Sequence, residues 1–303
     1  MKKRLSLLFL FLGQISFGQT EKHIKVQGTK CSIIPPSGFA TATTFSGFQN
    51  TETGASIMIN EIPGSYQSIV EGFTAEALKS KGMKLLTKQI IDFNGSKANL
   101  LSLIQTAYGT TYLKQMLVFG DTIVTVLVNG IYPEASKDLE QKIKDAILST
   151  VYNNLQDDNP IEAATFTIDI KDTEFKLIKY MSGGLLYSTD GKIPTEKPTL
   201  IVGNSIAKVS SQNYKKYSEE RLRKLPRGEF NVIKEINEVT IDNLNGFEIV
   251  ANGKTKDEKV ELIYQVMLFN DKGDYYIIVG KTSVDFDKYL ENFKKITKTF
   301  KRK

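Results

Sequence analysis

The sequence contains two similar stretches half a chain apart, and this repetition limits the folds that it can adopt. Residues 114–121 (KQMLVFGD) are echoed by residues 264–271 (YQVMLFND). The identities lie 150 positions apart and are Gln115 and Gln265, Phe119 and Phe269, and Asp121 and Asp271. Upstream, Ile91-Asp92 matches Ile241-Asp242, and Asn94-Gly95 matches Asn245-Gly246 after a slip of one residue. A match over about 60 residues is longer than the repeats of solenoid proteins, about 20–50 residues, so we expect two related domains of one fold.

Length and composition agree with two globular domains. The chain has 303 residues, and domains usually contain about 100–200. Its 41% hydrophobic residues can build two cores, and its 24% charged residues are close to the average of about 25% for globular proteins.

The first residues predict an export signal. A basic segment, Lys2-Lys3-Arg4, precedes an apolar run over residues 5–12, and the small residues Ser16 and Gly18 follow. This order is typical of a secretory signal peptide, and the run is shorter than the roughly 20 residues of a membrane-spanning helix. We expect cleavage after Gly18 or one residue later; an uncleaved amphipathic anchor is the alternative. The ending at residues 16–19 (SFGQ) resembles export signals of the Bacteroidetes group.

The expected location is therefore outside the cytoplasm, in the periplasm or the extracellular space. Gly18-Gln19 stands where a lipoprotein would have cysteine, so we expect no lipid anchor. We also expect no transmembrane span once the signal is removed.

Charge and cysteine content exclude further classes. The formal net charge of +6 includes the three cations of the signal, and without them the mature chain has +3. Its cations are mixed with acids apart from the tail at residues 298–303, so we expect no nucleic-acid partner, which would need a basic face. The single cysteine, Cys31, cannot form an internal disulfide, and we expect it to be a small buried hydrophobic residue and not a reactive thiol.

Periodicity predicts the same order of elements in both halves. The first half should contain early strands at 32–34, 40–45 and 55–60, a helix at 68–81, a meander with strands at 84–93, 98–106, 111–119 and 122–128, and a closing helix at 133–151. Residues 153–164 lack apolar periodicity and are the expected linker. The second half should contain strands at 175–180, 185–188 and 199–202, a helix at 211–225, strands at 231–241, 247–253, 260–269 and 275–279, and a helix at 286–300.

The expected fold class is therefore α+β, with two tandem antiparallel sheets each flanked by helices. We place the signal peptide at 1–18, the first domain at 19–152, the linker at 153–164 and the second domain at 165–303.

No catalytic constellation is evident. The only histidine, His23, lies just beyond the predicted cleavage point, where we expect a mobile chain, so the segment around Ser205 (GNSIA, 203–207) has no later histidine for a hydrolase triad. Ser205 and Lys208 satisfy the Ser-x-x-Lys spacing of penicillin-recognising enzymes. The partner-like motif Ser211-Gln212-Asn213 is nearly adjacent to Ser205, whereas that chemistry needs motifs on separate elements. Gly280-Lys281-Thr282 lacks the glycine that a phosphate loop requires five positions earlier, and no calcium-loop spacing occurs. We assign no catalytic, cofactor-binding or metal-binding residue.

The first half resembles the PsbP-like superfamily, which includes DcrB-like bacterial envelope proteins and a Ran-binding nuclear import factor. The resembling residues are 34–39 (IPPSGF), Asn94-Gly95 and the closing helix at 133–151. The second half has only 182–185 (SGGL) in place of the initial motif, and its resemblance depends on the duplication. The resemblance implies an antiparallel sheet flanked by helices and a role in binding or assembly, without a shared catalytic set.

These observations favour an exported, non-enzymatic binding or accessory protein of the cell envelope. The expected partner is an envelope protein or a small ligand, and a groove between the two domains is the expected place for it. The alternatives are an exported serine hydrolase that uses Ser205 and Lys208, and a purely structural envelope component.

Overall fold

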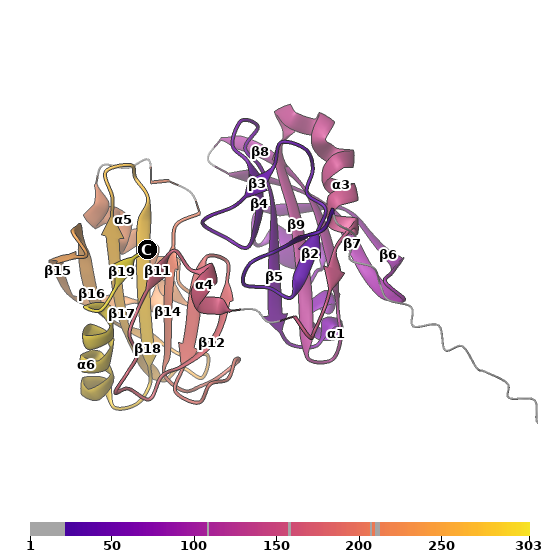
Figure 1. The fold of residues 1–303 in the computed structure, drawn as a ribbon. Helices are drawn as coiled ribbons and strands as arrows, with labels where there is room; N and C mark the ends of the chain where they lie inside the picture. The colour runs from indigo at the N-terminus through magenta and orange to yellow at the C-terminus, as the bar shows by residue number, and fades with distance from the viewer. Residues whose placement is uncertain (1–21, 108, 157–158, 207, 210–212) are drawn as a thin grey trace, which may run out of the picture.

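Two seven-stranded antiparallel sheets form the centre of the protein (Figure 1). The computed structural model describes residues 22–303 except 108, 157–158, 207 and 210–212. The proposed signal segment at 1–18 lies outside these residues. None of the helices in the described residues is long and apolar enough to span a bilayer.

The first sheet has the order β3-β4-β5-β9-β8-β7-β6. Its strands are β3 (Ala40–Thr41), β4 (Gly47–Asn50), β5 (Ala55–Pro63), β6 (Met83–Phe93), β7 (Ser96–Ala107), β8 (Thr110–Gly120) and β9 (Val124–Pro133). The predicted four-strand meander, β6 to β9, is confirmed. The predicted strand at 40–45 is wrong beyond Thr41, since the chain turns there to begin β4.

The second sheet repeats this wiring with the order β12-β13-β14-β18-β17-β16-β15. Its strands are β12 (Lys176–Met181), β13 (Gly184–Ser188), β14 (Thr199–Asn204), β15 (Val232–Ile241), β16 (Leu244–Lys254), β17 (Val260–Phe269) and β18 (Tyr275–Thr282). In both sheets the first three strands form one side. After a helical segment, the next four strands form a meander that starts at the opposite edge and ends beside the third strand. The α+β class and the internal duplication are thus seen directly in the strand order.

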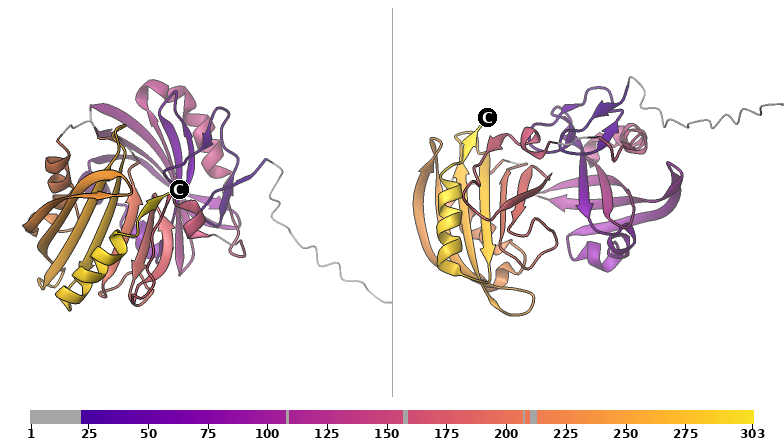
Figure 2. Two further views of the ribbon diagram at one scale, coloured as in Figure 1. Left: turned by 60° about the vertical axis from the view of Figure 1, so that its left-hand side comes forward. Right: turned by 60° about the horizontal axis from the view of Figure 1, so that its bottom comes forward.

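Helices cover both faces of each sheet. One face of the first sheet packs on α1 (Tyr66–Glu71) and α2 (Ala75–Lys79), and the other on α3 (Glu140–Leu148). The faces of the second sheet pack on α5 (Tyr214–Arg223) and α6 (Phe286–Thr297) in the same way. Figure 2 shows α6 lying along one face of its sheet.

Short elements complete the two halves. The 3₁₀ helix η1 (Glu134–Leu139) precedes α3, and η2 (Gly228–Phe230) precedes β15. A small sheet joins β1 (Ile24–Lys25), β2 (Cys31–Ile33) and β10 (Val151–Tyr152), and another joins β11 (Phe166–Thr167) and β19 (Lys301–Arg302). The segment predicted as a linker contains one helical turn, α4 (Pro160–Ala163).

Two predicted helices differ from the structure. The helix expected at 68–81 is broken at Gly72, and Thr74 starts α2 because its side chain accepts a hydrogen bond from Ala77 N at 3.1 Å. The closing helix of the first half ends at Leu148, before the predicted end at Val151, because Val151 pairs with Ser32 in a strand. Leu139, Ile143 and Ile147 recur every four residues, which predicts one apolar stripe along this segment, and all three are buried.

Each closing helix packs against a glycine of the sheet. A Cβ on Gly130 in β9 would overlap the fully buried Ile143 of α3. A Cβ on Gly280 in β18 would lie 2.5 Å from the ring of Phe293 of α6, which is also fully buried. Gly130 and Gly280 are therefore structural equivalents, and both let a large side chain reach the sheet.

The repeated sequence is one residue out of register on β8 and β17. Gln115 lies opposite Gly130, but Gly280 lies opposite Tyr264. The structural counterpart of Gln115 is thus Tyr264 and not Gln265. The wiring is duplicated, while the residue-by-residue match that suggested the duplication is wrong on these strands.

The one-residue shift sends the two glutamines to different layers, because successive strand residues point to opposite faces. Gln115 donates from Nε2 to Glu140 Oε1 at 3.2 Å, beside α3. Gln265 donates to the carbonyl oxygen of Ser218 in α5 at 2.8 Å. The offset of 150 residues is restored in the hairpin between β17 and β18, which is one residue longer than the hairpin between β8 and β9. The longer hairpin is closed by a backbone hydrogen bond between residues 270 and 274, and the shorter one by a bond between residues 121 and 124.

The upstream part of the match is also corrected. Asn94-Gly95 is a two-residue turn with φ values of 47° and 79°, and its counterpart is Asp242-Asn243, with 52° and 58°. Both have the positive φ pair of a type I′ hairpin turn. The predicted match, Asn245-Gly246, lies within β16.

Candidate functional site

The serine predicted for the hydrolase alternative lies at the end of β14. Ser205 is 6% exposed, and its Oγ accepts a hydrogen bond from the backbone N–H of Tyr275 at 3.0 Å. Lys208 is exposed, and no hydrogen bond joins it to Ser205 in the described part of the chain. The structure therefore gives the hydroxyl a backbone partner and does not bring it together with the lysine.

The other singled-out residues have structural partners. His23 was expected on a mobile segment, but its Nε2 lies 3.0 Å from the carbonyl oxygen of Ser149. Cys31 is fully buried, as predicted, and burial, followed by the charge of Glu61, raises the pKa of its thiol well above the usual value. Among the described residues, no group of three or more His, Cys, Asp or Glu side chains could hold a metal ion.

A polar joint connects the two halves, where the sequence predicts a groove. Asn204 donates from Nδ2 to the carbonyl oxygen of Thr44 at 3.0 Å, and Lys179 donates from Nζ to the carbonyl oxygen of Glu61. Gly183, with a φ of +82°, lies so close to Thr44 that a Cβ would overlap the Thr44 carbonyl oxygen. The backbone of the second half thus docks directly on the first.

A small pocket of about 230 Å³ lies at this joint. Its walls come from Gln27 and residues 41–47 of the first half, and from residues 162–165 and Tyr180 of the second. Ser46 lines it with a buried Oγ that has no hydrogen-bond partner among the described residues. Burial raises the pKa of Tyr180 to about 12, so its hydroxyl stays neutral. The pocket can offer hydrogen bonds to a small polar molecule.

A larger groove of about 770 Å³ opens on the α5 face of the second sheet. We call it the aromatic groove; it is lined by Asn213, Tyr214, Lys215, Glu238, Val239, Thr240, Asn245, Gly246, Phe247 and Phe269. One wall is the first turn of α5, the other is the outer strand β15, and the floor is formed by β16 and β17. Its volume is typical of ligand sites, about 300–1,000 Å³.

Aromatic packing fixes the α5 wall. The rings of Tyr214 and Phe269 stack in parallel, with centroids 4.2 Å apart and planes 10° apart. Tyr217 reaches the same cluster, with its centroid 6.4 Å from Phe269 and 5.7 Å from Tyr275. These contacts hold the start of the helix against the end of β17 and keep the groove formed without a ligand.

The floor of the groove depends on a glycine. A Cβ on Gly246 would overlap the carbonyl oxygen of Met267 on the neighbouring strand. Phe247 follows it and lies half-buried on the groove side. Because Gly246 has no side chain, β16 and β17 can approach closely there, and this approach positions Phe247.

The rim of the groove is polar and carries both signs of charge. Thr240 Oγ1 and Asn245 Oδ1 are hydrogen-bonded at 2.8 Å across β15 and β16. Glu238 on β15 and Lys215 on α5 are both exposed, and neither takes part in an ion pair among the described residues. An aromatic floor between one carboxylate and one ammonium suits binding of an apolar body with charged groups.

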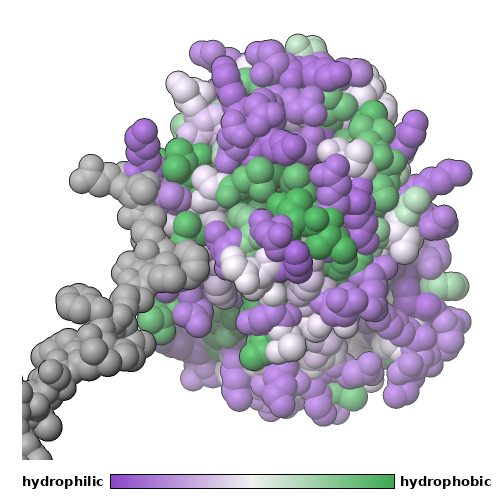
Figure 3. Space-filling model, turned by 90° about the vertical axis from the view of Figure 1, so that its right-hand side faces the viewer, coloured by the Kyte–Doolittle hydropathy of each residue, from purple (hydrophilic) through white to green (hydrophobic). Residues whose placement is uncertain are grey.

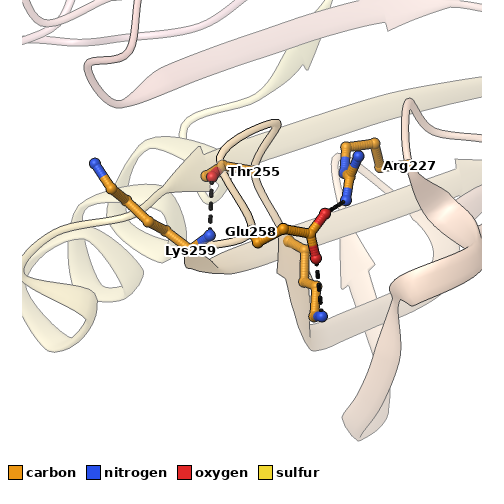
Figure 4. Close-up of polar contacts among 5 residues, drawn as sticks. Arg227, Thr255, Glu258 and Lys259 are labelled. Atoms are coloured by element: carbon orange, nitrogen blue, oxygen red, sulfur yellow. Dashed lines mark hydrogen bonds and ion pairs between the residues drawn. The ribbon is translucent and has the colours of Figure 1, made fainter.

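The charged cluster in Figure 4 has a structural role at the other end of the second sheet. Glu258 in the β16–β17 hairpin pairs with Lys254 at 3.0 Å and with Arg227, and these contacts, Lys254 first, lower the pKa of its carboxyl group. The Arg227 guanidinium also lies 4.7 Å from the ring centroid of Phe230. The cluster ties the hairpin to the loop after α5, and its charges are already paired.

The face of the first half in Figure 3 gathers hydrophobic side chains within a hydrophilic frame. Leu86 and Ile90 of β6 are among the exposed hydrophobic residues of this half, at 48% and 71%. Lys84 and Lys88 on the same strand, and its bulge after Leu85, are features that protect a sheet edge from pairing. The cavity beside β6, about 360 Å³, is lined by polar side chains apart from Leu100 and has no aromatic floor.

Sequence reasoning found part of the aromatic groove. The spacing of Tyr214 and Tyr217 predicts that both lie on one face of a helix, and Tyr275 and Tyr276, as consecutive residues of a strand, are expected on opposite faces. Tyr275 indeed contacts Tyr217, whereas Tyr276 contacts Phe300 on the other face. Glu238, Phe247 and Lys215 were missed, because nothing in their spacing indicates that three separate segments meet.

Comparison with known proteins gives similarities of fold. No family model matches the chain, and no curated protein has a similar sequence. Among solved structures, LpqN of Mycobacterium tuberculosis, described as involved in cell envelope biogenesis, is 15% identical over 45% of this chain and 82% of its own, with a TM-score of 0.36. PsbP of the cyanobacterium Synechocystis is 14% identical over 47% of this chain and 99% of its own, with a TM-score of 0.30.

A third similarity extends over both halves. The immunity protein TplEi of Pseudomonas aeruginosa, solved in complex with a peptide, is 13% identical over 93% of this chain and 98% of its own, with a TM-score of 0.34. PsbP is thus among the structures that this chain is similar to, as the resemblance of the first half predicts. At these TM-scores the similarities carry no conclusion about a ligand or a partner.

Proposed function

We propose that the chain is an exported binding or accessory protein of the cell envelope, that it has no catalytic activity of its own, and that it holds its partner in the aromatic groove. The observation that carries the proposal is the groove itself. Stacked rings preform it, and it has an apolar floor and two charged side chains, Glu238 and Lys215, that form no ion pair among the described residues. Such a site retains a ligand by contact and needs no reacting group. Export rests on the signal-like sequence at 1–18.

The test is capture of a partner from the envelope by the full chain. The tagged protein is expressed in its source bacterium and crosslinked, and the envelope fraction is purified. We expect one partner that is retained by the native chain and lost with Phe247→Ala or Glu238→Lys. The matched control is Gln89→Ala in the polar cavity beside β6, which should retain the partner. A partner that remains with both groove variants would place binding elsewhere, and a chain that stays in the cytoplasm would contradict export.

The mature N-terminus and a serine probe test the two remaining expectations. Mass spectrometry of the exported protein should find a chain that begins at Gln19 or Thr20. A fluorophosphonate probe should not label the native protein, because the Ser205 hydroxyl is buried and bonded to the backbone. Labelling that disappears in Ser205→Ala would instead establish the hydrolase alternative.

A further inference from the structure

The aromatic groove runs beside a free sheet edge. β15 is the outermost strand of the second sheet and pairs only with β16 in the described structure. It spans ten residues, and the backbone N–H and C=O groups along its outer side can pair with another strand. Its bulge, between Ile233 and Glu235, lies outside the stretch 236–241 that borders the groove.

The side chains of this stretch point alternately into the groove. Glu238 lies opposite Phe247, and Thr240 lies opposite Asn245, and all four line the groove. A peptide that adds to β15 continues the same pleat, so every second side chain of the peptide projects over the groove. The free edge and the cavity therefore form one binding surface.

The charges define the chemistry of the occupant. Glu238 extends from β15 and Lys215 from α5, on opposite walls, with Phe247 and Phe269 between them. On a strand added to β15, the side chain beside Glu238 should therefore be basic, and an apolar side chain next to it on the groove side can lean toward Phe247.

We infer that the edge of β15 and the adjoining part of the aromatic groove bind an extended peptide segment of a partner protein, with a basic side chain beside Glu238 and an apolar side chain next to it on the groove side. This inference rests on the proposed function and specifies its partner. The equivalent face of the first half is covered by α1 and α2, and Lys88 on its edge strand β6 is bonded to the carbonyl oxygens of Val70 and Phe73.

A phage-displayed library of random linear peptides, selected on the full mature chain, tests this inference. We expect enriched peptides in which a basic residue and an apolar residue are two positions apart, because side chains on one face of a strand alternate with those on the other. Fluorescence anisotropy of the best peptide should show about tenfold or greater weakening with Phe247→Ala and with Glu238→Lys. The matched control is Glu235→Lys, on the same strand but paired with Val250 on the α6 face, which should change affinity little.

Two further measurements separate this binding mode from others. Selection on Glu238→Lys should yield peptides with an acidic residue in place of the basic one. A methyl group on a backbone nitrogen of the peptide should abolish binding only when it is placed at alternate residues, because only every second N–H faces β15. Thermal unfolding confirms that Phe247→Ala is folded, and Glu238→Lys is an exposed change that tests the site independently.

The inference is overturned if no peptide is selected, or if selected peptides bind both groove variants as tightly as the native chain. Binding of saccharides on a glycan array, without peptide binding, would assign the groove to another ligand class. An envelope partner that is captured while no peptide binds would leave the proposed function standing and remove only this inference.

Discussion

Asp121 and Asn270 close equivalent hairpins of different length, and in each a side-chain oxygen accepts two backbone hydrogen bonds. Asp121 Oδ1 accepts hydrogen bonds from the backbone N–H groups of Ile123 and Val124 at 2.7 and 2.8 Å. Asn270 Oδ1 accepts from Lys272 N and Asp274 N at 3.0 and 2.9 Å. The bonds from Val124 and then Ile123 lower the pKa of the Asp121 carboxyl group, whereas the amide of Asn270 does not titrate.

The Asp121 turn should therefore lose stability in acid. A pKa that is lower in the folded than in the unfolded state gives stabilisation that is present above the unfolded value, about 3.9, and is lost as pH falls through the folded value. Asp121→Asn should lower the thermal midpoint by about 1–2 °C at pH 7, because an exposed charged bond contributes only about 0.5 kcal/mol. The difference should vanish near pH 2, as followed by circular dichroism.

The second half supplies a contrast for this prediction. Asn270→Asp should lose stability at pH 7 and regain part of it in acid, because the new carboxylate would lie beside Asp274 Oδ2, which accepts a hydrogen bond from Asn270 Nδ2 at 3.2 Å. If Asp121→Asn lowers the thermal midpoint by the same amount at pH 7 and at pH 2, the carboxylate charge has no role.

Single residues of the candidate site could be predicted only where they belong to a core. Tyr214 and Tyr217 follow helical spacing and were placed on one face correctly, because burial leaves a periodic signature. Glu238 and Lys215 are exposed charges, and exposed charged positions have no such signature. Both line the groove only because α5 leaves one end of the sheet uncovered. The local sequence around neither residue predicts this position of α5.

At the scale of elements, periodicity predicted the strands well and their register poorly. The meander of β6 to β9 and that of β15 to β18 are formed as expected, because alternation and turn residues act locally. The register between copies depends on turn length, and the second hairpin is one residue longer. Gln115 and Gln265 therefore match in sequence but face α3 and α5, a difference that a one-residue slip produces on any strand.

Packing of the closing helices on glycine gives a prediction at this scale. Gly280→Ala should lower the free energy of unfolding by about 1–3 kcal/mol, because the new methyl group would overlap the fully buried ring of Phe293. Gly130→Ala should act similarly through Ile143. Urea unfolding followed by far-UV circular dichroism measures both changes.

A double-mutant cycle shows whether the overlap is the cause. Phe293→Leu makes room beside residue 280, so Gly280→Ala should cost less in that background, with a coupling energy of about 0.5–3 kcal/mol. Simple addition of the two costs would mean that the ring does not oppose the methyl group. The cost would then come from the backbone of β18.

At the scale of the whole molecule, the two halves share wiring but differ in what they leave open. In the first half, α1 and α2 both cover the face that corresponds to the α5 face of the second half. In the second half α5 packs on this face, and the aromatic groove remains beside it. The first half instead carries the polar cavity beside α3. The two halves thus share their sheet order and differ in their helical cover, which explains why the aromatic groove lies in the second half.

The joint between the halves gives the last prediction. Lys179→Ala with Asn204→Ala removes two hydrogen bonds to the first half, each contributing about 0.5–1.5 kcal/mol. The population of separated halves should rise about tenfold to a hundredfold, since each 1.4 kcal/mol is a factor of ten. Proteolysis within residues 153–164 should accelerate accordingly, and small-angle scattering should report a larger radius of gyration. Far-UV circular dichroism should not change, because each sheet keeps its own core.

Two variants distinguish loss of the joint from general destabilisation. Lys176→Ala removes an exposed lysine from the same strand, and the described structure gives it no hydrogen bond to the first half, so cleavage should remain at the native rate. Gly183→Ala should act like the double variant without removing any bond, because its methyl group would overlap the Thr44 carbonyl oxygen at a φ of +82°. If Gly183→Ala and the double variant both cleave at the native rate, these contacts do not hold the halves together, and the proposed groove must act from a domain that moves independently of the first.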